Sequence, residues 1–240
     1  MAAQRAQRLR VAAVIPTLNE AETIAGVIAA VPRGAVDEIV VVDGGSGDGT
    51  VAAARAAGAQ VICAGRGYGR ACQAGATAAA DCDIVVFLDG DGSDAPDQIP
   101  LLVAPIVGGI ADFVIGSRTR GHREKGSMGA HQRLAGQAVG ALLGLLYGVH
   151  YSDMGPMRAI RRAALLNLGM REMGYGWNLE MQMRAARAGL RILEVPVMHR
   201  RRAGGASKVS GTVAGTMRAG WRIALTLVRV ALEARRQPII

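Results

Sequence analysis

The sequence predicts an α/β fold in which a mainly parallel central sheet is flanked by helices, with an amphipathic helix at the C-terminal end. Two observations predict it. The chain has 240 residues, 50% of them apolar, which is enough for a sizeable core and excludes a disordered chain. In its first half, short β-rich runs alternate with alanine-rich helical segments, the pattern of a βαβα domain.

The elements follow in order along the chain. The predicted strands are residues 11–15, 38–42, 60–64, 84–88 and 113–115. The predicted helices between them are residues 20–30, 49–57, 69–80 and 97–108. In the second half the alternation stops, and we expect a basic loop at 117–129, a long helix at 134–151, a helix at 177–188 and a strand pair at 192–199.

Four polar, glycine-rich turns follow the predicted strands. They are PTLNE (16–20), DGGSGDGT (43–50), GRGYG (65–69) and DGDGSD (89–94). Because ligands of parallel sheets gather at the carboxyl ends of the strands, we expect these turns to share one edge and to form the binding site.

The last of these turns concentrates negative charge behind a buried strand. Its aspartates are Asp89, Asp91 and Asp94, with Asp97 close behind. Carboxylates this close repel one another, so a folded protein pairs them with cations or binds a metal. Their hard oxygen ligands suit Mg²⁺ or Mn²⁺ in a turn that we expect to face solvent. Alternatively, Asp94 or Asp97 caps the following helix.

Charge is distributed unevenly along the chain. Residues 1–115 hold seven Lys and Arg residues against thirteen Asp and Glu residues, a net charge of −6, whereas residues 116–240 hold 21 against 6, a net charge of +15. The acidic half suggests a bound cation, and the basic half suggests an anionic partner, unless its arginines only form a solvated surface. Aromatic residues make up 3% of the chain and offer few stacking platforms, which argues against a nucleic-acid partner.

The cysteines and the apolar segments bear on localisation. Three cysteines without zinc-type spacing indicate a reducing compartment, so we expect the cytoplasm. The apolar run at 11–15 is too short for a signal peptide. The uncharged stretch at 134–151 includes Gln137 and His150, and we interpret it as a buried or interfacial helix.

The C-terminal segment carries an apolar stripe at helical spacing. The stripe consists of Met217, Trp221, Leu225, Val228 and Leu232, with Arg218, Arg222 and Arg229 beside it. This pattern suits a helix that lies on an anionic membrane surface without spanning the membrane. It equally suits a helix packed on the domain or against a second subunit in a homo-oligomer.

Two nucleotide-binding motifs fail at a required position. GYGRAC has Cys72 where a dinucleotide motif needs glycine, and GGSGDGT lacks the lysine of a Walker loop.

A resemblance to a known family covers about residues 10–210. The segments VIPTLNEAETI, EIVVVDGGSGDGT, GYGRACQAG, FLDGDGSDAPD, VIGSRTRG, YSDMGPMRAI, GYGWNLEMQMRAARAG and EVPVMHRRRAGGASKVS occur in the order and approximate spacing of glycosyltransferase family 2. The chain most resembles the dolichol-phosphate mannose synthase branch.

The resemblance implies a single nucleotide-sugar-binding domain of the GT-A type. It implies Mg²⁺ or Mn²⁺, a nucleotide-diphosphate sugar donor, and inverting transfer of a hexose to a polyprenyl phosphate at the inner face of the membrane. We therefore expect a glycosyltransferase domain at 1–210, with a donor and metal half at 1–115 and an acceptor half at 116–210, and the amphipathic helix at 211–240.

The family's motifs also assign site residues. Those matching nucleotide-sugar contacts are Pro16, Leu18, Glu20, Val42, Asp43, Asp89, Gly90 and Arg118. Those matching metal ligands are Asp89, Asp91 and Ser93, and those matching catalytic groups are Asp91, Arg202 and Lys208. Arg133, Asp153, Arg158 and Glu180 fall in the acceptor half, where a structural salt bridge is an equal alternative. The chain departs from the family at Leu18, Gly44 and Ser93, where tyrosine, aspartate and glutamine are common.

Two enzymatic alternatives remain at this point. One keeps nucleotide-sugar chemistry but gives it a soluble phosphorylated acceptor. The other is a sugar-nucleotide nucleotidyltransferase, although the N-terminal turn lacks the glycine-rich loop with Arg or Lys that such chemistry favours.

Overall fold

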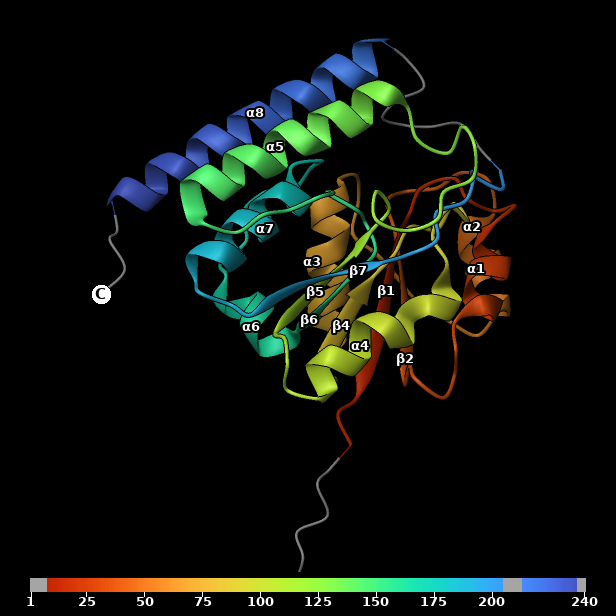
Figure 1. The fold of residues 1–240 in the computed structure, drawn as a ribbon. Helices are drawn as coiled ribbons and strands as arrows, with labels where there is room; N and C mark the ends of the chain where they lie inside the picture. Colours follow the sequence, from red (N-terminus) through yellow and green to blue (C-terminus); the bar gives the residue numbers. More distant parts are fainter. Residues whose placement is uncertain (1–7, 205–212, 237–240) are drawn as a thin grey trace, which may run out of the picture.

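The computed structural model describes residues 8–204 and 213–236. In this part of the chain, seven strands form one sheet in the order β3-β2-β1-β4-β6-β5-β7 (Figure 1). The strands are β1 (Val11–Thr17), β2 (Glu38–Asp43), β3 (Gln60–Cys63), β4 (Ile84–Phe87), β5 (Phe113–Ser117), β6 (Arg158–Arg161) and β7 (Ile192–Pro196). Only β6 is antiparallel to its neighbours, β4 and β5. The predicted mainly parallel sheet is confirmed.

Helices cover both faces of the sheet. They are α1 (Ile24–Ala30), α2 (Thr50–Ala56), α3 (Tyr68–Ala78), α4 (Ile99–Val107), α5 (Ala130–Tyr147), α6 (Arg162–Asn167), α7 (Trp177–Arg187) and α8 (Val213–Arg236), with a short 3₁₀ turn, η1 (Pro96–Gln98), before α4. One core, which includes Ile28 of α1 and Leu102 of α4, fills the first face. The second core includes Cys72 of α3, Trp177 of α7 and Val230 of α8.

The central strands are apolar on both faces because helices cover both. Val14 of β1 lies in the second core, whereas Ala13 and Ile15 lie in the first. All three are fully buried. Near-continuous apolar runs of this kind are expected in parallel strands with both faces covered, which explains why the sequence revealed them.

Four elements differ from the sequence prediction. The predicted strand pair at 192–199 is wrong: β7 ends at Pro196, and His199 forms only isolated bridges with Asp94 and Arg123. The long helix begins and ends four residues earlier than expected. It ends after Tyr147 because Gly148 adopts a left-handed conformation (φ 70°). Neither β6 nor α6 was predicted.

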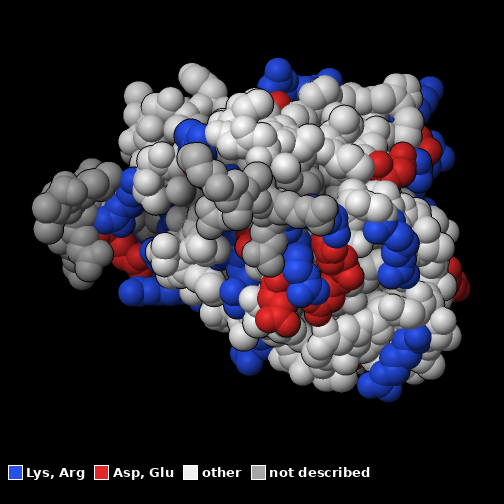
Figure 2. Space-filling view, turned by 90° about the horizontal axis from the view of Figure 1, so that it is seen from below, with Lys and Arg blue, Asp and Glu red and all other residues white. Residues whose placement is uncertain are grey.

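Charged side chains of both signs meet at the amino edge of the sheet, which Figure 2 views from below. Asp112, just before β5, pairs with Arg191 at 2.7 Å and with Arg161 at 3.5 Å. Asp37, before β2, pairs with Arg8. These acids are neutralised locally, which leaves the opposite edge as the place to look for ligand-binding charges.

Across residues 8–204 and 213–236, no helix has the length and hydrophobicity to cross a membrane.

Candidate active site

The turns after β1, β2 and β4 meet at the carboxyl edge of the sheet. Pro16 lies opposite Val42 in the parallel register, and the Gly44 N–H donates to the Thr17 carbonyl at 2.8 Å. Gly90 packs so closely on Thr17 that an added Cβ would lie 2.7 Å from its methyl carbon. Three of the four predicted turns therefore come together, and glycine is needed where they touch.

The carboxylate turn at 89–94 is folded by its own side chains. The Asp89 N–H donates to Asp94 Oδ2 at 2.9 Å, and the Ser93 N–H donates to Asp91 Oδ1 at 2.9 Å. Gly92 between them has φ 76°, a conformation that favours glycine. Asp91 and Asp94 are both only 2% exposed. The expectation that this turn faces solvent is therefore wrong.

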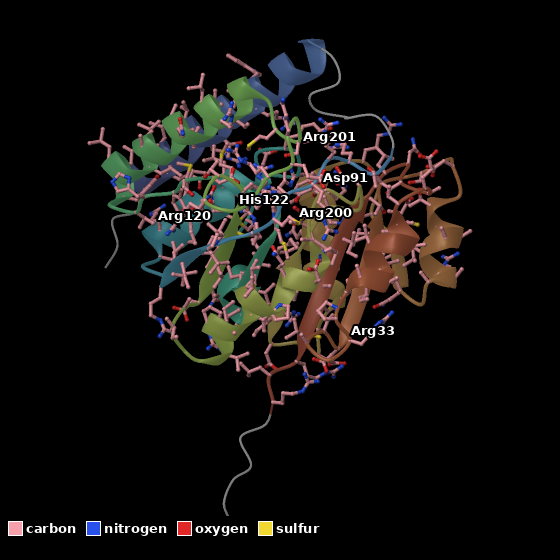
Figure 3. The ribbon with its side chains drawn as sticks, turned by 45° about the vertical axis from the view of Figure 1, so that its right-hand side comes forward. Arg33, Asp91, Arg120, His122, Arg200 and Arg201 are labelled. Atoms are coloured by element: carbon pink, nitrogen blue, oxygen red, sulfur yellow. The ribbon has the colours of Figure 1, made fainter. Side chains whose placement is uncertain are left out.

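The turn is covered by the segment at residues 199–203. Arg202 Nη2 lies 3.0 Å from Asp91 Oδ2, and the Ala203 N–H donates to the Asp91 carbonyl at 3.1 Å. The Arg200 N–H donates to the Ser93 carbonyl at 2.8 Å. Figure 3 shows Asp91, Arg200 and Arg201 together at this end of the molecule. The arginine run at 200–202 thus folds back onto the carboxylate turn.

The proposed helix caps are wrong. Neither η1 nor α4 has a side-chain cap, and their N-cap residues are Ala95 and Gln98. The Asp94 carboxylate instead accepts the Asp89 N–H. Asp97 is exposed, and its carboxylate lies 3.7 Å from Arg200 Nη2. Asp94 therefore belongs to the carboxylate site, whereas Asp97 lies outside it.

Burial and crowding change the protonation of the site. Burial, followed by the charges of Asp94 and Asp91, raises the pKa of Asp89 well above its usual range. Burial also raises the pKa of Asp94. Burial, followed by the nearby Arg118 guanidinium, lowers the pKa of His199 to about 4, so its imidazole is neutral near pH 7. A site that disfavours its own carboxylate charges is one that a bound cation would relieve.

The side chains of this site are chemically suited to bind a divalent cation. His199 is 5% exposed, its Nδ1 lies 3.9 Å from Asp94 Oδ1, and this nitrogen has no hydrogen-bond partner among the described residues. A neutral imidazole and carboxylates are donors that Mn²⁺ accepts, and carboxylates suit Mg²⁺. Within the described ranges, no three His, Cys, Asp or Glu side chains form a ready-made metal site. The remaining ligands would have to be water or phosphate oxygens, as is usual for Mg²⁺.

Arg118, at the end of β5, forms a buried bidentate pair with Asp153. Its Nε and Nη2 each donate to the carboxylate at 2.8 Å, and its backbone N–H donates at 2.9 Å. Although burial opposes the charge of Asp153, these bonds lower the pKa of that carboxyl. The pair holds a guanidinium close enough to influence the charge states of Asp89 and Asp94.

Most of the residues predicted to bind the nucleotide-sugar donor lie at the carboxyl edge of the sheet. There, Asp43 also stabilises the backbone of its own turn. Its carboxylate accepts the Gly45 N–H at 2.8 Å and the Ser46 N–H at 3.0 Å. These hydrogen bonds stabilise the turn after β2 independently of any contact that Asp43 makes with a ligand. Leu18 and Glu20 are partly exposed in the turn after β1, and the Glu20 N–H donates to Thr50 Oγ1 at 2.8 Å.

The four acceptor-side residues are not gathered in one place. Arg133 is exposed on α5. Arg158 is fully buried, and its guanidinium donates to the carbonyls of Asn178 and Gly155. Glu180 accepts from Arg184 Nε at 2.9 Å and Arg229 Nη2 at 3.1 Å, so it links α7 to α8. Only Asp153 adjoins the carboxylate site, through its pair with Arg118.

Lys208 lies outside the described residues. The remaining predicted site residue that the structure places, Ser93, is buried within the carboxylate turn. His199 is the functional candidate that the sequence prediction missed. Its signal was a histidine directly before the arginine run in EVPVMHRRRAGGASKVS.

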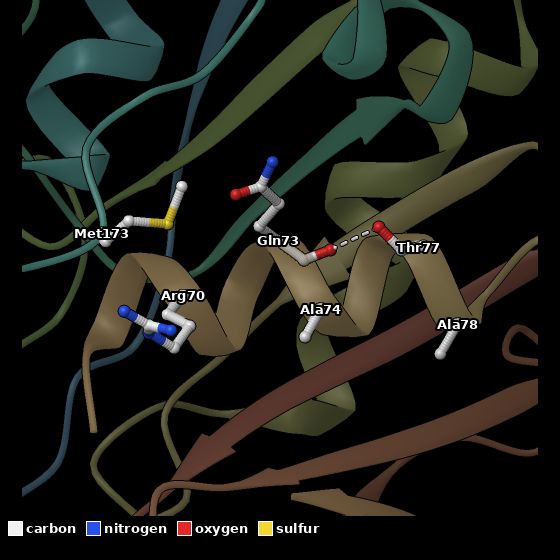
Figure 4. Close-up of a pocket in the computed structure, with 6 residues that line it drawn as sticks. All are labelled: Arg70, Gln73, Ala74, Thr77, Ala78 and Met173. Carbon is white, nitrogen blue, oxygen red and sulfur yellow. Dashed lines mark hydrogen bonds between the residues drawn. The ribbon is translucent and has the colours of Figure 1, made fainter. Parts of the chain in front are cut away.

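The turn at 65–69 is packed against the segment at 170–176. A Cβ on Gly69 would lie 2.2 Å from the Glu172 carbonyl oxygen, and the Arg70 N–H donates to the Met173 carbonyl at 3.1 Å. A pocket of about 570 Å³ follows α3 beside this contact (Figure 4). Its lining residues are Arg70, Gln73, Ala74, Thr77, Ala78 and Met173, none of which is a predicted site residue.

With this geometry in place, known proteins identify the family. A family model of glycosyl transferase family 2 matches residues 12–169. The chain belongs to glycosyl transferase family 2. An uncharacterized glycosyltransferase of Mycobacterium tuberculosis is 39% identical over 212 residues, covering 86% of this chain and 93% of its own length.

Two further relatives have named activities. A dolichyl-phosphate hexose transferase of Haloferax volcanii is 35% identical over 93% of this chain and 95% of its own. An undecaprenyl-phosphate mannosyltransferase of Micrococcus luteus is 32% identical over 86% of this chain and 90% of its own. The resemblance to the polyprenyl-phosphate branch is thereby confirmed.

Solved structures confirm the fold. Mannosyl-3-phosphoglycerate synthase from Rubrobacter xylanophilus has a TM-score of 0.76 at 20% identity, covering 97% of this chain and 77% of that one. Glucosyl-3-phosphoglycerate synthase from Mycobacterium tuberculosis, solved with Mn²⁺, UDP-glucose and phosphoglyceric acid, has a TM-score of 0.74 at 26% identity over 93% and 80%. The predicted GT-A fold and glycosyltransferase class are therefore correct.

Proposed function

We propose that this glycosyltransferase moves a hexose from a nucleotide-diphosphate sugar to a polyprenyl phosphate, with inversion and with Mg²⁺ or Mn²⁺ as cofactor. The observation that carries the proposal is the meeting of Asp89 and Asp91 with Arg202 and Arg118 at one edge of the sheet. This edge therefore holds carboxylates that would bind a metal ion, and guanidinium groups that would bind the diphosphate and an anionic acceptor. Relatives with polyprenyl-phosphate names support the choice of acceptor.

The proposed reaction requires little proton transfer by the protein. An acceptor phosphate oxygen attacks the anomeric carbon, a new C–O bond forms, and the bond to the nucleotide diphosphate breaks on the opposite face. Because the attacking phosphate is already anionic, no strong general base is required. The main requirement is to neutralise charge on both substrates and on the leaving group.

The chain's own residues meet that requirement as follows. Asp89, Asp91 and the neutral His199 would hold the divalent ion, which when bound offsets the charge of the leaving diphosphate. Arg202 would bind a phosphate oxygen, and Lys208 remains a predicted partner in this role. Arg118, fixed by Asp153, adds positive potential without needing to move.

A soluble phosphorylated acceptor is the second candidate. It is favoured by the solved structure of a 26% identical glucosyl-3-phosphoglycerate synthase with phosphoglyceric acid bound. The two candidates share the donor chemistry and differ only in what the arginines bind, so one experiment can separate them.

The test is a transfer assay with a panel of nucleotide sugars, each with Mg²⁺, Mn²⁺ or a chelator, and with polyprenyl phosphate or phosphoglycerate as acceptor. We expect transfer to the lipid that a chelator abolishes. Arg202→Ala and Lys208→Ala should each lower kcat/KM at least about tenfold, equivalent to about 1.4 kcal/mol of transition-state stabilisation. Arg200→Ala is the matched control, because that guanidinium lies 3.7 Å from the exposed Asp97, outside the carboxylate site.

Transfer to phosphoglycerate alone would overturn the lipid acceptor while keeping the family. Near-normal activity of Asp91→Asn at saturating metal would overturn the metal site. Because Asp91 is buried and ion-paired, a circular dichroism melting curve of this variant must accompany its activity.

A further inference from the structure

Asn19 has a left-handed backbone conformation in the turn after β1. Its φ is 52°, and it is the only residue other than glycine with a positive φ in the part of the chain that the structure describes. This conformation is strained for most residues and is tolerated best by glycine, asparagine and aspartate. Because Asn19 is exposed, burial does not force the conformation on it. Hydrogen bonds to a neighbouring turn supply the constraint instead.

Both the backbone and the side chain of Asn19 bind the turn after β2. The Asn19 N–H donates to Ser46 Oγ at 2.8 Å. Asn19 Oδ1 accepts the Gly47 N–H at 3.0 Å. The two bonds join segments that are 27 and 28 residues apart in the sequence. We call Asn19, Ser46 and Gly47 the turn clamp.

Two further hydrogen bonds hold the same turns together. The Glu20 N–H donates to Thr50 Oγ1 at 2.8 Å, and the Ala21 N–H donates to Asp48 Oδ2 at 3.2 Å. Helices α1 and α2, which follow the two turns, lie side by side (Figure 1). The two connections therefore form one unit at the carboxyl edge of the sheet, where ligands of parallel sheets bind.

The turn clamp is directly connected to residues predicted to bind the nucleotide-sugar donor. Leu18 and Glu20 flank Asn19, so the φ of Asn19 sets the direction of the chain between them. Ser46 Oγ, which accepts from the Asn19 N–H, donates in turn to Asp43 Oδ1. A change in the turn clamp would therefore reach three predicted donor residues without any contact between Asn19 and the donor.

Two roles for Asn19 make different predictions. If only its φ matters, glycine replaces it without loss, because glycine adopts a positive φ freely. If the turn clamp matters, glycine fails, because it has no Oδ1 to accept the Gly47 N–H. The bond across 28 residues favours the second role, since a residue that serves only its own turn has no need of it.

We propose that Asn19 is a positioning residue for the nucleotide-sugar donor. Its amide fixes the turn after β2 against the turn after β1, and so fixes the spacing between the donor contacts of the two turns. A site that is already ordered loses less conformational freedom when the donor binds, which raises its affinity. The inference deepens the proposed function, on whose donor it rests, and it does not depend on the acceptor.

The experiment compares Asn19→Gly with the matched control Asn167→Gly, which removes the same amide from an exposed position at the end of α6. Calorimetric titration with UDP-glucose and with GDP-mannose, each with Mn²⁺, measures the donor dissociation constant, and circular dichroism melting measures stability. We expect Asn19→Gly to raise the dissociation constant of the tighter probe at least about threefold, as loss of one hydrogen bond implies. Its Tm should change by less than about 3 °C.

The control should keep the dissociation constant of wild type whatever its Tm, so that affinity and stability vary independently. Amide hydrogen exchange of Gly47 in the ligand-free protein tests the turn clamp without any donor, and it should be faster in Asn19→Gly. Donor binding by Asn19→Gly within about twofold of wild type, or unchanged exchange at Gly47, would overturn the inference.

A wild type that binds neither probe would overturn the inference as well. A wild type that binds a probe but transfers no sugar to polyprenyl phosphate gives a different result. It would refute the acceptor in the proposed function and leave the role of Asn19 standing.

Discussion

Two ion pairs of the same geometry, one buried and one exposed, allow a sharp test of the electrostatics of the site. In both, an arginine donates its backbone N–H, Nε and Nη2 to one aspartate: Arg118 to Asp153, and Arg191 to Asp112. The side chains of Arg118 and Asp153 are 18% and 2% exposed, against 54% and 19% for Arg191 and Asp112. The pairs differ in burial, and Asp112 also has a second arginine, Arg161, at 3.5 Å.

Replacing the aspartate by asparagine in each pair should have unequal effects. Asp153→Asn leaves a buried guanidinium without its counter-charge, which costs about 3–5 kcal/mol. Asp112→Asn breaks a solvent-screened pair, which costs about 1 kcal/mol or less. Adding Arg118→Met to Asp153→Asn should restore part of the loss, because the unpaired charge is then gone.

The measurement is urea unfolding followed by circular dichroism, with free energies compared only where the slopes agree. A double variant no more stable than Asp153→Asn would show that the buried charge is not the cause. The reasoning is refuted if Asp153→Asn and Asp112→Asn cost the same within about 1 kcal/mol.

Three further outcomes are expected. Gly69→Ala should lower the unfolding free energy by about 1–3 kcal/mol because its Cβ would lie 2.2 Å from the Glu172 carbonyl oxygen, whereas Gly26→Ala, which meets nothing within 4 Å in α1, should stabilise in the same urea assay. Hydrogen bonds from its arginine partner lower the pKa of Asp112 to about 2, below the unfolded value of about 3.9, so the carboxylate stabilises the fold above about pH 4. This contribution is lost as pH falls towards 2, and the urea midpoints of wild type and Asp112→Asn should converge there. Glu180→Gln should speed amide hydrogen exchange in α8, since it weakens the contacts that hold α8 to α7.

The parallel strands were predictable because their signal is local. Both faces of these strands are covered, so each is a short apolar run that the sequence displays directly. Strand β6 has arginines at both ends and only Ala159 and Ile160 between them. It forms because β4 and β5 both pair with it, and because the carbonyls of Gly155 and Asn178 accept hydrogen bonds from the buried Arg158. These are tertiary causes, which no local pattern contains.

The candidate site likewise contains residues that the sequence predicts and residues that only tertiary contacts bring into place. The carboxylate turn stands out in the sequence because its three aspartates lie within six residues directly after an apolar run. His199 joins it only through a tertiary contact, its isolated bridge with Asp94, and Asp153 is placed by a partner 35 residues away. For α8, the spacing of Trp221 and Leu225 predicted the stripe but could not decide which side faces the core. That depends on Glu180 and its neighbours under the helix.

The opposite charges of the two halves of the chain meet at the candidate site before any substrate is present. Arg202 lies 3.0 Å from Asp91, so a basic residue of the second half already neutralises the acidic turn of the first. A cation that bound Asp91 would compete with Arg202 for the same carboxylate, and the released guanidinium would then favour an anion. A metal and a diphosphate that arrive together supply both charges at once, whereas either alone leaves one internal charge unpaired. The ion pair therefore gives a physical reason why this site should bind metal and nucleotide sugar together in preference to either alone.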